Sequence, residues 1–229
     1  MGAYDWVAPA YFGPEAALDF VAFDLETTGL DCRKERIVEI GAVRFDRRGP
    51  IGRFSVLIDP GVPMPADASR INGITDEMLK GKPSLDEVLG DFLRFARDAV
   101  LVAHNATFDC GFVDAALAER FERSRKRRSE DAAQGSLLDA AAPEGAESGP
   151  KATAWTPPFA ALPHRIVDTK NYAKEAFPGR WKYALQELAR YLGIEAKDAH
   201  RAEDDARVCM ELFIKCAEKS SGKEVPTYP

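Results

Sequence analysis

The stretch "VAFDLETTGL", residues 21–30, places two carboxylates, Asp24 and Glu26, inside a run that is otherwise typical of a buried strand. Successive side chains of a strand point to opposite faces, so Asp24 and Glu26 share one face and the apolar odd-numbered residues share the other. Two neighbouring anions repel each other, and desolvation makes each more costly. A bound divalent cation such as Mg²⁺ would relieve both costs. The alternative is an exposed strand end whose acids are solvated.

Composition limits the class of protein. The chain has 229 residues, 45% of them hydrophobic, so it can bury a proper core as one large domain or two small ones. Its net charge of −6 gives no overall signature of nucleic-acid binding, although metals and local basic patches can outweigh net charge. We expect no membrane span and no signal peptide. Four cysteines without a CxxC pair are typical of thiols in a reducing cytoplasm, where we expect the protein to be located.

The pattern of apolar residues predicts an α/β fold. Three strands at 19–26, 36–46 and 52–60 are joined closely enough to form an antiparallel meander. A helix follows Ser84, where Glu87 completes a capping-box pattern. Further elements are expected as a strand at 99–105, a helix at 107–121, a short strand at 164–168, and helices at 169–176, 182–192 and 202–218. Strands followed by strand–helix alternation indicate a mixed sheet covered by helices.

The predicted domain occupies residues 18–217, between an arm at 1–17 and a tail at 218–229. Residues 60–75 are rich in Pro and Gly and are expected to be a connection. Residues 122–158 contain much Ala, Ser, Gly, Pro and charge but few large apolar residues, so we expect a flexible insertion. Its basic run "RSRKRR", 123–128, is either a solvated face or a patch that contacts phosphates.

Two further stretches carry acids beside core elements. "LVAHNATFDCGFV", 101–113, places Asp109 early in a helix that follows a buried strand. "DAHRAEDDARVCMELF", 198–213, places His200 and Asp205 near the start of the last long helix. Together with the two acids of the first strand, this makes four carboxylates and one imidazole. That set matches a site that holds two metal ions and activates a water molecule.

The motifs "FDLETTGL", "HNATFD" and "HRAEDDA" resemble the three exonuclease motifs of the DEDD superfamily, in its histidine-containing branch. That branch includes the DNA polymerase III epsilon family, ribonuclease T and oligoribonuclease. The shorter words "INGIT", "VDT" and "YALQELARYLGI" agree with the same family. The resemblance covers residues 19–121 and 164–216, nearly all of the chain outside the arm, the insertion and the tail.

The resemblance implies a ribonuclease H-like fold, a mixed sheet flanked by helices, and hydrolysis of nucleotides in the 3′→5′ direction. By similarity, two Mg²⁺ or Mn²⁺ ions are held by Asp24, Glu26, Asp109 and Asp205, and His200 is the general base. An imidazole suits that role because its neutral form is available at neutral pH. The acidic pair 203–204 departs from the family pattern, but the five-residue spacing from His200 selects Asp205 over its neighbour.

The resemblance also indicates residues that bind the terminal nucleotide. The backbone around Thr27, Thr28 and Gly29 is expected to contact it, and the loop carrying His104, Asn105 and Phe108 is expected to line its pocket. His104 is alternatively a structural histidine, and Phe108 a core residue. Asp168 is expected to cap the helix that follows it, with contact to the site as the alternative.

The leading expectation is an enzyme most like the DNA polymerase III epsilon family, which acts on single-stranded or frayed DNA 3′ ends. An exoribonuclease of the ribonuclease T or oligoribonuclease type is the alternative, because the sequence does not choose between DNA and RNA. Within the insertion, Gln134, Leu137 and Leu138 of "QGSLL" resemble the short clamp-binding peptide of bacterial replication and repair proteins. The expected partners are therefore a sliding clamp or a replicative polymerase, and a chance match is the alternative. A different class of function is an adaptor that keeps the fold without catalysis, although the complete set of acids argues against it.

Overall fold

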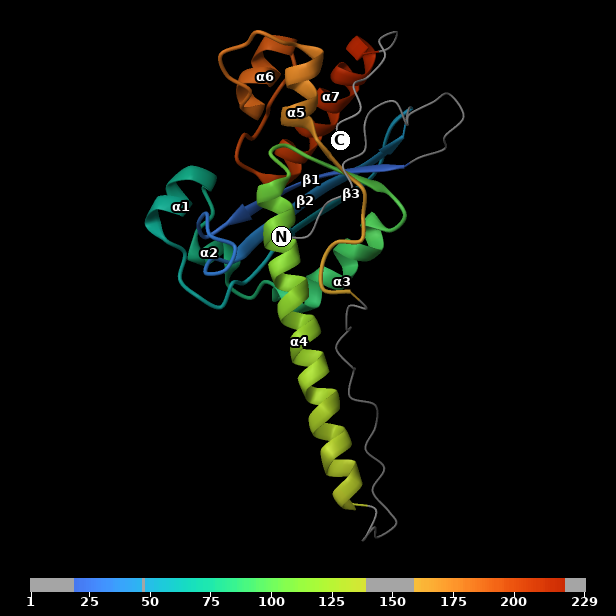
Figure 1. Cartoon of the computed structure of the whole chain (residues 1–229). Helices are drawn as coiled ribbons and strands as arrows, with labels where there is room; N and C mark the ends of the chain where they lie inside the picture. Colours follow the sequence, from blue (N-terminus) through green and yellow to red (C-terminus); the bar gives the residue numbers. More distant parts are fainter. Residues whose placement is uncertain (1–18, 47, 139–158, 221–229) are drawn as a thin grey trace. The chain divides into compact units, whose positions relative to one another are not determined.

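The computed structural model describes residues 19–46, 48–138 and 159–220, with backbone alone at 131–138 (Figure 1). The described residues divide into two compact units, one within 19–112 and 164–220 and the other within 113–138 and 159–163. Among the described residues, no helix is both long enough and apolar enough to cross a membrane.

The first unit contains one five-stranded sheet in the order β3-β2-β1-β4-β5. Its strands are β1 (Phe20–Thr27), β2 (Ile37–Asp46), β3 (Gly49–Leu57), β4 (Val100–Ala103) and β5 (Ile166–Asp168). The first three form the predicted antiparallel meander, whereas β4 pairs with β1, and β5 with β4, in parallel. The sheet is mixed, as expected for the α/β class.

Helices cover both faces of this sheet (Figure 1). On one face the ring of Phe20 lies 5.3 Å from that of Phe45 and 5.0 Å from that of Phe213, which belongs to α7 (Ala202–Ser220). On the other face the Phe23 ring lies 5.6 Å from that of Phe92 in α3 (Leu85–Ala96). Even-numbered residues of β1 therefore face α7, and odd-numbered residues face α3.

Two shorter helices, α5 (Thr169–Ala176) and α6 (Leu185–Leu192), share an apolar core with α7 and the sheet. Helix α3 begins at the predicted capping box between Ser84 and Glu87. The register places Glu39 of β2 directly opposite Glu26 of β1, on the face that α7 covers.

The expected connection at 60–75 is partly helical, so that prediction was wrong in part. It contains α1 (Ala66–Asn72), and α2 (Asp76–Leu79) follows it. Pro65 immediately precedes α1, where its missing N–H costs nothing, and Gly73 ends the helix with a positive φ of 68°. The buried side chains of a small apolar cluster hold this segment in place: Val38, Met64, Ile74 and Leu79.

Helix α4 (Thr107–Leu138) continues well past residue 121, where the sequence predicted its end. The extra turns carry Glu, Arg and Lys, which are good helix formers and pair along the helix at i,i+3 and i,i+4 spacing. Helical segments need no large apolar residues when such pairs support them, so the expectation of an insertion without structure fails for 122–138. The rest of the insertion, at 139–158, lies outside the described residues, as do the arm and residues 221–229 of the tail.

Candidate metal centre

Three carboxylates from two elements meet on the sheet face that α7 covers. Asp24 and Glu26 come from β1, and Asp205 comes from the first turns of α7; one oxygen of each lies within 4.8 Å of the others. The two strand residues are half-buried, whereas the Asp205 side chain is buried, with only 6% of the residue exposed. The strand's alternation places its two acids on one face, as the sequence predicted, and the helix adds the third.

Hydrogen bonds hold the Asp205 carboxylate in place on both oxygens. Its Oδ1 accepts from Nε2 of Gln186 in α6 at 2.6 Å, and its Oδ2 accepts from the backbone N–H of His200 at 3.1 Å. Sequence reasoning missed Gln186, because nothing local links a polar residue in α6 to an acid nineteen positions later. Only the tertiary fold brings the two together.

Asp109 reaches the same strand from the first turn of α4. Strand β4 pairs with β1 only as far as Ala22, and beyond that point Oδ1 of Asp109 accepts from the backbone N–H of Leu25 at 3.2 Å. Leu25 lies between Asp24 and Glu26, so the buried Asp109 carboxylate is a neighbour of both. It does not belong to the group of three oxygens that lie together.

Burial and mutual repulsion disfavour the charged forms of these acids. Burial raises the pKa of Asp24 well above its usual range, and the charges of Asp109 and Asp205 raise it further. Burial likewise raises the pKa of Glu26 to about 8, with repulsion by Asp205 added, and the pKa of Asp109 to about 8. Desolvation raises the pKa of Asp205 as well, although the hydrogen bond from the His200 N–H opposes it.

The donor set fits a divalent cation. Hard ions such as Mg²⁺ and Mn²⁺ prefer carboxylate oxygens, and Asp24, Glu26 and Asp205 offer three of them from different directions. A cation there would offset the repulsion that raises their pKa values. The two acids in a core strand are therefore part of a carboxylate cluster whose oxygens suit a divalent cation.

His200 stands at the edge of this centre, two residues before α7 begins. It is exposed, and its backbone has a positive φ of 66°, which is uncommon for a residue with a side chain. Its backbone N–H donates a hydrogen bond to the Asp205 carboxylate, so the backbone of the histidine is fixed relative to one of the three acids. An exposed imidazole beside a carboxylate cluster can accept a proton from a water molecule.

The predicted nucleotide loop is held by its own side chains. The Thr27 hydroxyl donates to the carbonyl of Gly29 at 2.7 Å, and the Thr28 hydroxyl donates to Glu35 at 2.6 Å and accepts from the Arg36 N–H. The two hydroxyls are therefore used to shape the turn. A contact with a nucleotide would fall to the backbone, as the resemblance implies.

His104 is engaged through both ring nitrogens. Nδ1 lies 2.9 Å from the Thr169 hydroxyl, and Nε2 lies 2.9 Å from the Tyr183 carbonyl. Burial lowers the pKa of this imidazole, which keeps it neutral. Of the two alternatives for His104, the geometry favours the structural one.

The neighbouring loop residues differ in how they are held. Asp168 caps α5 as predicted, accepting from the Lys170 N–H at 2.8 Å, and it also accepts from the Asn105 N–H at 3.0 Å. The Asn105 side chain accepts from Lys170 at 3.1 Å. Phe108 is half-buried, with its ring 5.0 Å from that of Phe112, so it packs against another ring and remains partly accessible.

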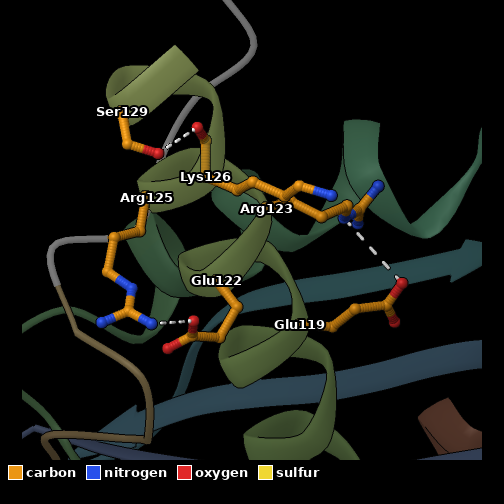
Figure 2. Close-up of a pocket in the computed structure, with 6 residues that line it drawn as sticks. All are labelled: Glu119, Glu122, Arg123, Arg125, Lys126 and Ser129. Atoms are coloured by element: carbon orange, nitrogen blue, oxygen red, sulfur yellow. Dashed lines mark hydrogen bonds and ion pairs between the residues drawn. The ribbon is translucent and has the colours of Figure 1, made fainter. Parts of the chain in front are cut away.

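The second unit contributes a surface pocket on α4, lined by five charged side chains and Ser129 (Figure 2). Arg125 pairs with Glu122 at 2.8 Å, and Arg123 with Glu119 at 3.8 Å. The basic run is therefore partly neutralised by acids of its own helix, which favours a solvated face for these two arginines. The backbone of the motif containing Gln134, Leu137 and Leu138 forms the last turns of α4, and its side chains lie outside the described residues.

The sequence matches a known enzyme family along most of its length. The RNase_T family model, described as exonuclease, matches residues 21–213. The chain is 44% identical over 212 residues to the DNA polymerase III subunit epsilon of Treponema pallidum, covering 92% of this chain and 80% of that protein. It is 31% identical over 221 residues to the PolC-type DNA polymerase III of Clostridium perfringens, covering 94% of this chain and 13% of that larger protein.

Solved structures of exonucleases share the fold. Exonuclease X in complex with 5′ overhanging duplex DNA aligns with a TM-score of 0.58 at 22% identity, covering 89% of this chain and 93% of that one. A structure of exonuclease I aligns with a TM-score of 0.63 at 17% identity, covering 88% of this chain and 41% of that one. These likenesses confirm the predicted ribonuclease H-like sheet flanked by helices.

Proposed function

Because the chain belongs to the RNase_T exonuclease family and is a 3′→5′ exonuclease, we propose that it removes nucleotides from DNA 3′ ends at the cluster of Asp24, Glu26 and Asp205. The meeting of these three carboxylates beside His200 is the observation that carries the proposal. DNA is favoured over RNA because both relatives named above are DNA polymerase III proteins.

Enzymes of this family depend on divalent metal, and we assign two Mg²⁺ or Mn²⁺ ions to the carboxylate cluster. The ligands we assign are Asp24, Glu26 and Asp205, with Asp109 acting directly or through water. When bound, the ions supply positive charge that stabilises the charge developing on the reacting phosphate.

The side chains of the protein organise the proton transfer. His200 accepts a proton from the attacking water as the water oxygen bonds to phosphorus and the P–O3′ bond breaks. The leaving 3′ oxygen takes a proton from solvent, and the terminal nucleotide departs with its 5′ phosphate. Asp205 holds His200, the general base, in position, because its carboxylate accepts a hydrogen bond from the His200 backbone N–H.

We assign the terminal nucleotide to the loop of Thr27, Thr28 and Gly29 and to Asn105 and Phe108, which precede Asp109 in the chain. The loop hydroxyls shape the turn and leave the backbone for the nucleotide. Phe108 is partly accessible, which suits contact with a base, because every base presents a face on which an aromatic side chain can stack.

The direct test is hydrolysis of matched, end-labelled DNA and RNA oligomers with and without Mg²⁺ or Mn²⁺. We expect metal-dependent shortening of single-stranded DNA from the 3′ end. Asp205→Asn should abolish it, whereas Glu203→Gln should not, because Glu203 lies on the same helix turn but pairs with Arg53 at 3.1 Å. Preferential loss of RNA would assign the chain to the exoribonuclease variant, and no hydrolysis of either would leave the adaptor alternative.

We also propose that the segment containing Gln134, Leu137 and Leu138 recruits the enzyme to a replicative assembly through the sliding clamp. Association with a polymerase is supported by the relatives, which are named as polymerase III proteins. A tethered peptide of modest affinity would raise the local concentration of the enzyme at the DNA end.

The test for recruitment titrates a peptide covering 130–142 against the clamp of the same organism. A control peptide carries Leu137→Ala and Leu138→Ala. Binding that the control peptide loses would support recruitment. Equal binding, or none, would leave the segment without this role.

A further inference from the structure

A further acid lies beside the metal centre without belonging to its group of three oxygens. Glu39 belongs to β2, stands opposite Glu26 in the sheet register, and is only 1% exposed. Its charge contributes to the raised pKa of Glu26, after burial and Asp205. Burying another anion beside a cluster of anions is costly, so its presence needs a reason.

Both oxygens of Glu39 are engaged by the start of α7. Oε1 accepts from Nη2 of Arg201 at 2.8 Å, and Oε2 accepts from Nε of Arg201 at 3.1 Å. The same Oε2 accepts from the backbone N–H of Ala202 at 3.2 Å. The two-point contact with the guanidinium fixes orientation as well as distance, and the third bond satisfies an N–H of the helix's first turn.

The backbone of β2 touches the same turn. A Cβ built on Gly41 would lie 2.1 Å from the carbonyl carbon of Ala202 and from the backbone nitrogen of Glu203. Gly41 is two residues from Glu39, so both face α7. Strand β2 therefore contacts the start of α7 in two ways. At Gly41 its backbone packs directly against the helix, and at Glu39 a carboxylate bonds to it.

His200 and Asp205 both depend on the turn at the start of α7. Arg201 lies between His200 and Ala202, and Asp205 donates its backbone N–H to the Arg201 carbonyl at 3.0 Å. The positive φ of His200 is a conformation that persists only when surrounding contacts enforce it. The bonds to Glu39 begin one residue later in the chain.

We propose that Glu39 is a positioning residue, which through Arg201 and the Ala202 N–H fixes the first turn of α7 so that His200 and Asp205 hold their places in the reaction. This inference rests on the proposed function, because it takes the roles of these two residues from it. A purely structural ion pair is the competing explanation, and the two differ in what a mild substitution changes.

The test compares Glu39→Gln and Arg201→Lys with wild type. The control is Asp19→Asn, which removes another arginine–carboxylate contact of β2: Arg44 donates to Asp19 at 3.0 and 2.7 Å. Two quantities are measured: kcat and KM on a DNA oligomer at saturating metal, and the NMR signals of the histidine rings in the metal-free protein. The chain has three histidines, so the His200 signal is assigned by its loss in His200→Gln.

We expect Glu39→Gln to lower kcat by roughly 10–100-fold with little change in KM, the usual effect of removing a residue that orients a functional group. The His200 signals should shift while those of His104 and His164 stay in place. Arg201→Lys should show the same pattern, which keeps the test available if Glu39→Gln does not fold, and Asp19→Asn should show neither change.

The proposal is overturned if kcat and the His200 signals of both folded variants match wild type, or if all three histidines shift together as in general loosening. The NMR result is independent of the reaction. If wild type fails to hydrolyse DNA, the proposed function is wrong, and the His200 signals still decide whether Glu39 fixes the helix start.

Discussion

Glu26 and Asp109 each have a pKa raised to about 8 in the folded chain, from ordinary values of 4.5 and 3.8, and burial is the main cause for both. A carboxyl group whose pKa is higher in the folded state binds its proton more tightly there. Its contribution to stability is full below the ordinary value and is lost as the pH rises through the folded value. The metal-free site therefore works against the fold at and above neutral pH.

The first prediction is that metal-free protein loses stability as the pH rises between about pH 5 and pH 8. Glu26→Gln should make this loss shallower, because one of the groups that must ionise is gone. Saturating Mg²⁺ should also reduce it, because cation binding favours the ionised carboxylates of the folded state. Urea unfolding at a series of pH values measures the slope, and an equal slope in wild type and Glu26→Gln would contradict the assignment.

The second prediction concerns His200. If it takes the proton from water, His200→Gln should lower kcat by roughly 10²–10⁴-fold, the range for loss of a general base. The rise of the rate with pH should disappear in this variant, while folding and metal binding are retained. Rates on a DNA oligomer across the pH range give the answer, and a pH profile equal to that of wild type would remove His200 from the role.

At the scale of elements, the site depends on how closely α7 approaches β2. The helix supplies Asp205 and positions His200, and the contact at Gly41 leaves no space for a side chain. A helix that carries a site carboxylate in its first turn must have that turn fixed, since any shift of the turn also moves the carboxylate.

The third prediction compares two Gly→Ala substitutions. Gly41→Ala should destabilise the protein by more than about 3 kcal/mol, because the new Cβ collides with backbone that cannot turn aside. Gly111→Ala should instead stabilise it by about 0.5–1 kcal/mol, because that residue lies inside α4 and a Cβ would meet only an ordinary contact at 3.8 Å. Thermal unfolding of both variants is the measurement, and equal melting temperatures would contradict the close packing at Gly41.

Local patterns in the sequence predict most elements of the sheet and its helices, since each strand and helix has its own periodicity or cap. They fail where the signal is not local. The segment 60–75, which contains α1, is predicted as a connection because it is rich in Pro and Gly. The charged turns of α4 are predicted as part of an insertion because they contain few large apolar residues. In both places the helix is supported by features that periodicity does not measure: a proline at the start, or ion pairs along the surface.

At the scale of the whole molecule, the site joins residues that lie far apart in the chain. Strand alternation indicates Asp24 and Glu26, and the resemblance to the exonuclease motifs selects Asp109 and Asp205. Glu39 and Gln186 are different, since their roles come from pairing across strands and from packing between helices. A sequence shows the groups that do chemistry more readily than the groups that hold them.

The central claim is that the carboxylate cluster is a divalent-metal site, and titration calorimetry with Mn²⁺ tests it most directly. We predict that wild type binds Mn²⁺, that Glu203→Gln binds it equally, and that Asp205→Asn loses most of the affinity, because it removes one of three clustered oxygen ligands. Binding by Asp205→Asn as tight as that of wild type would contradict the claim.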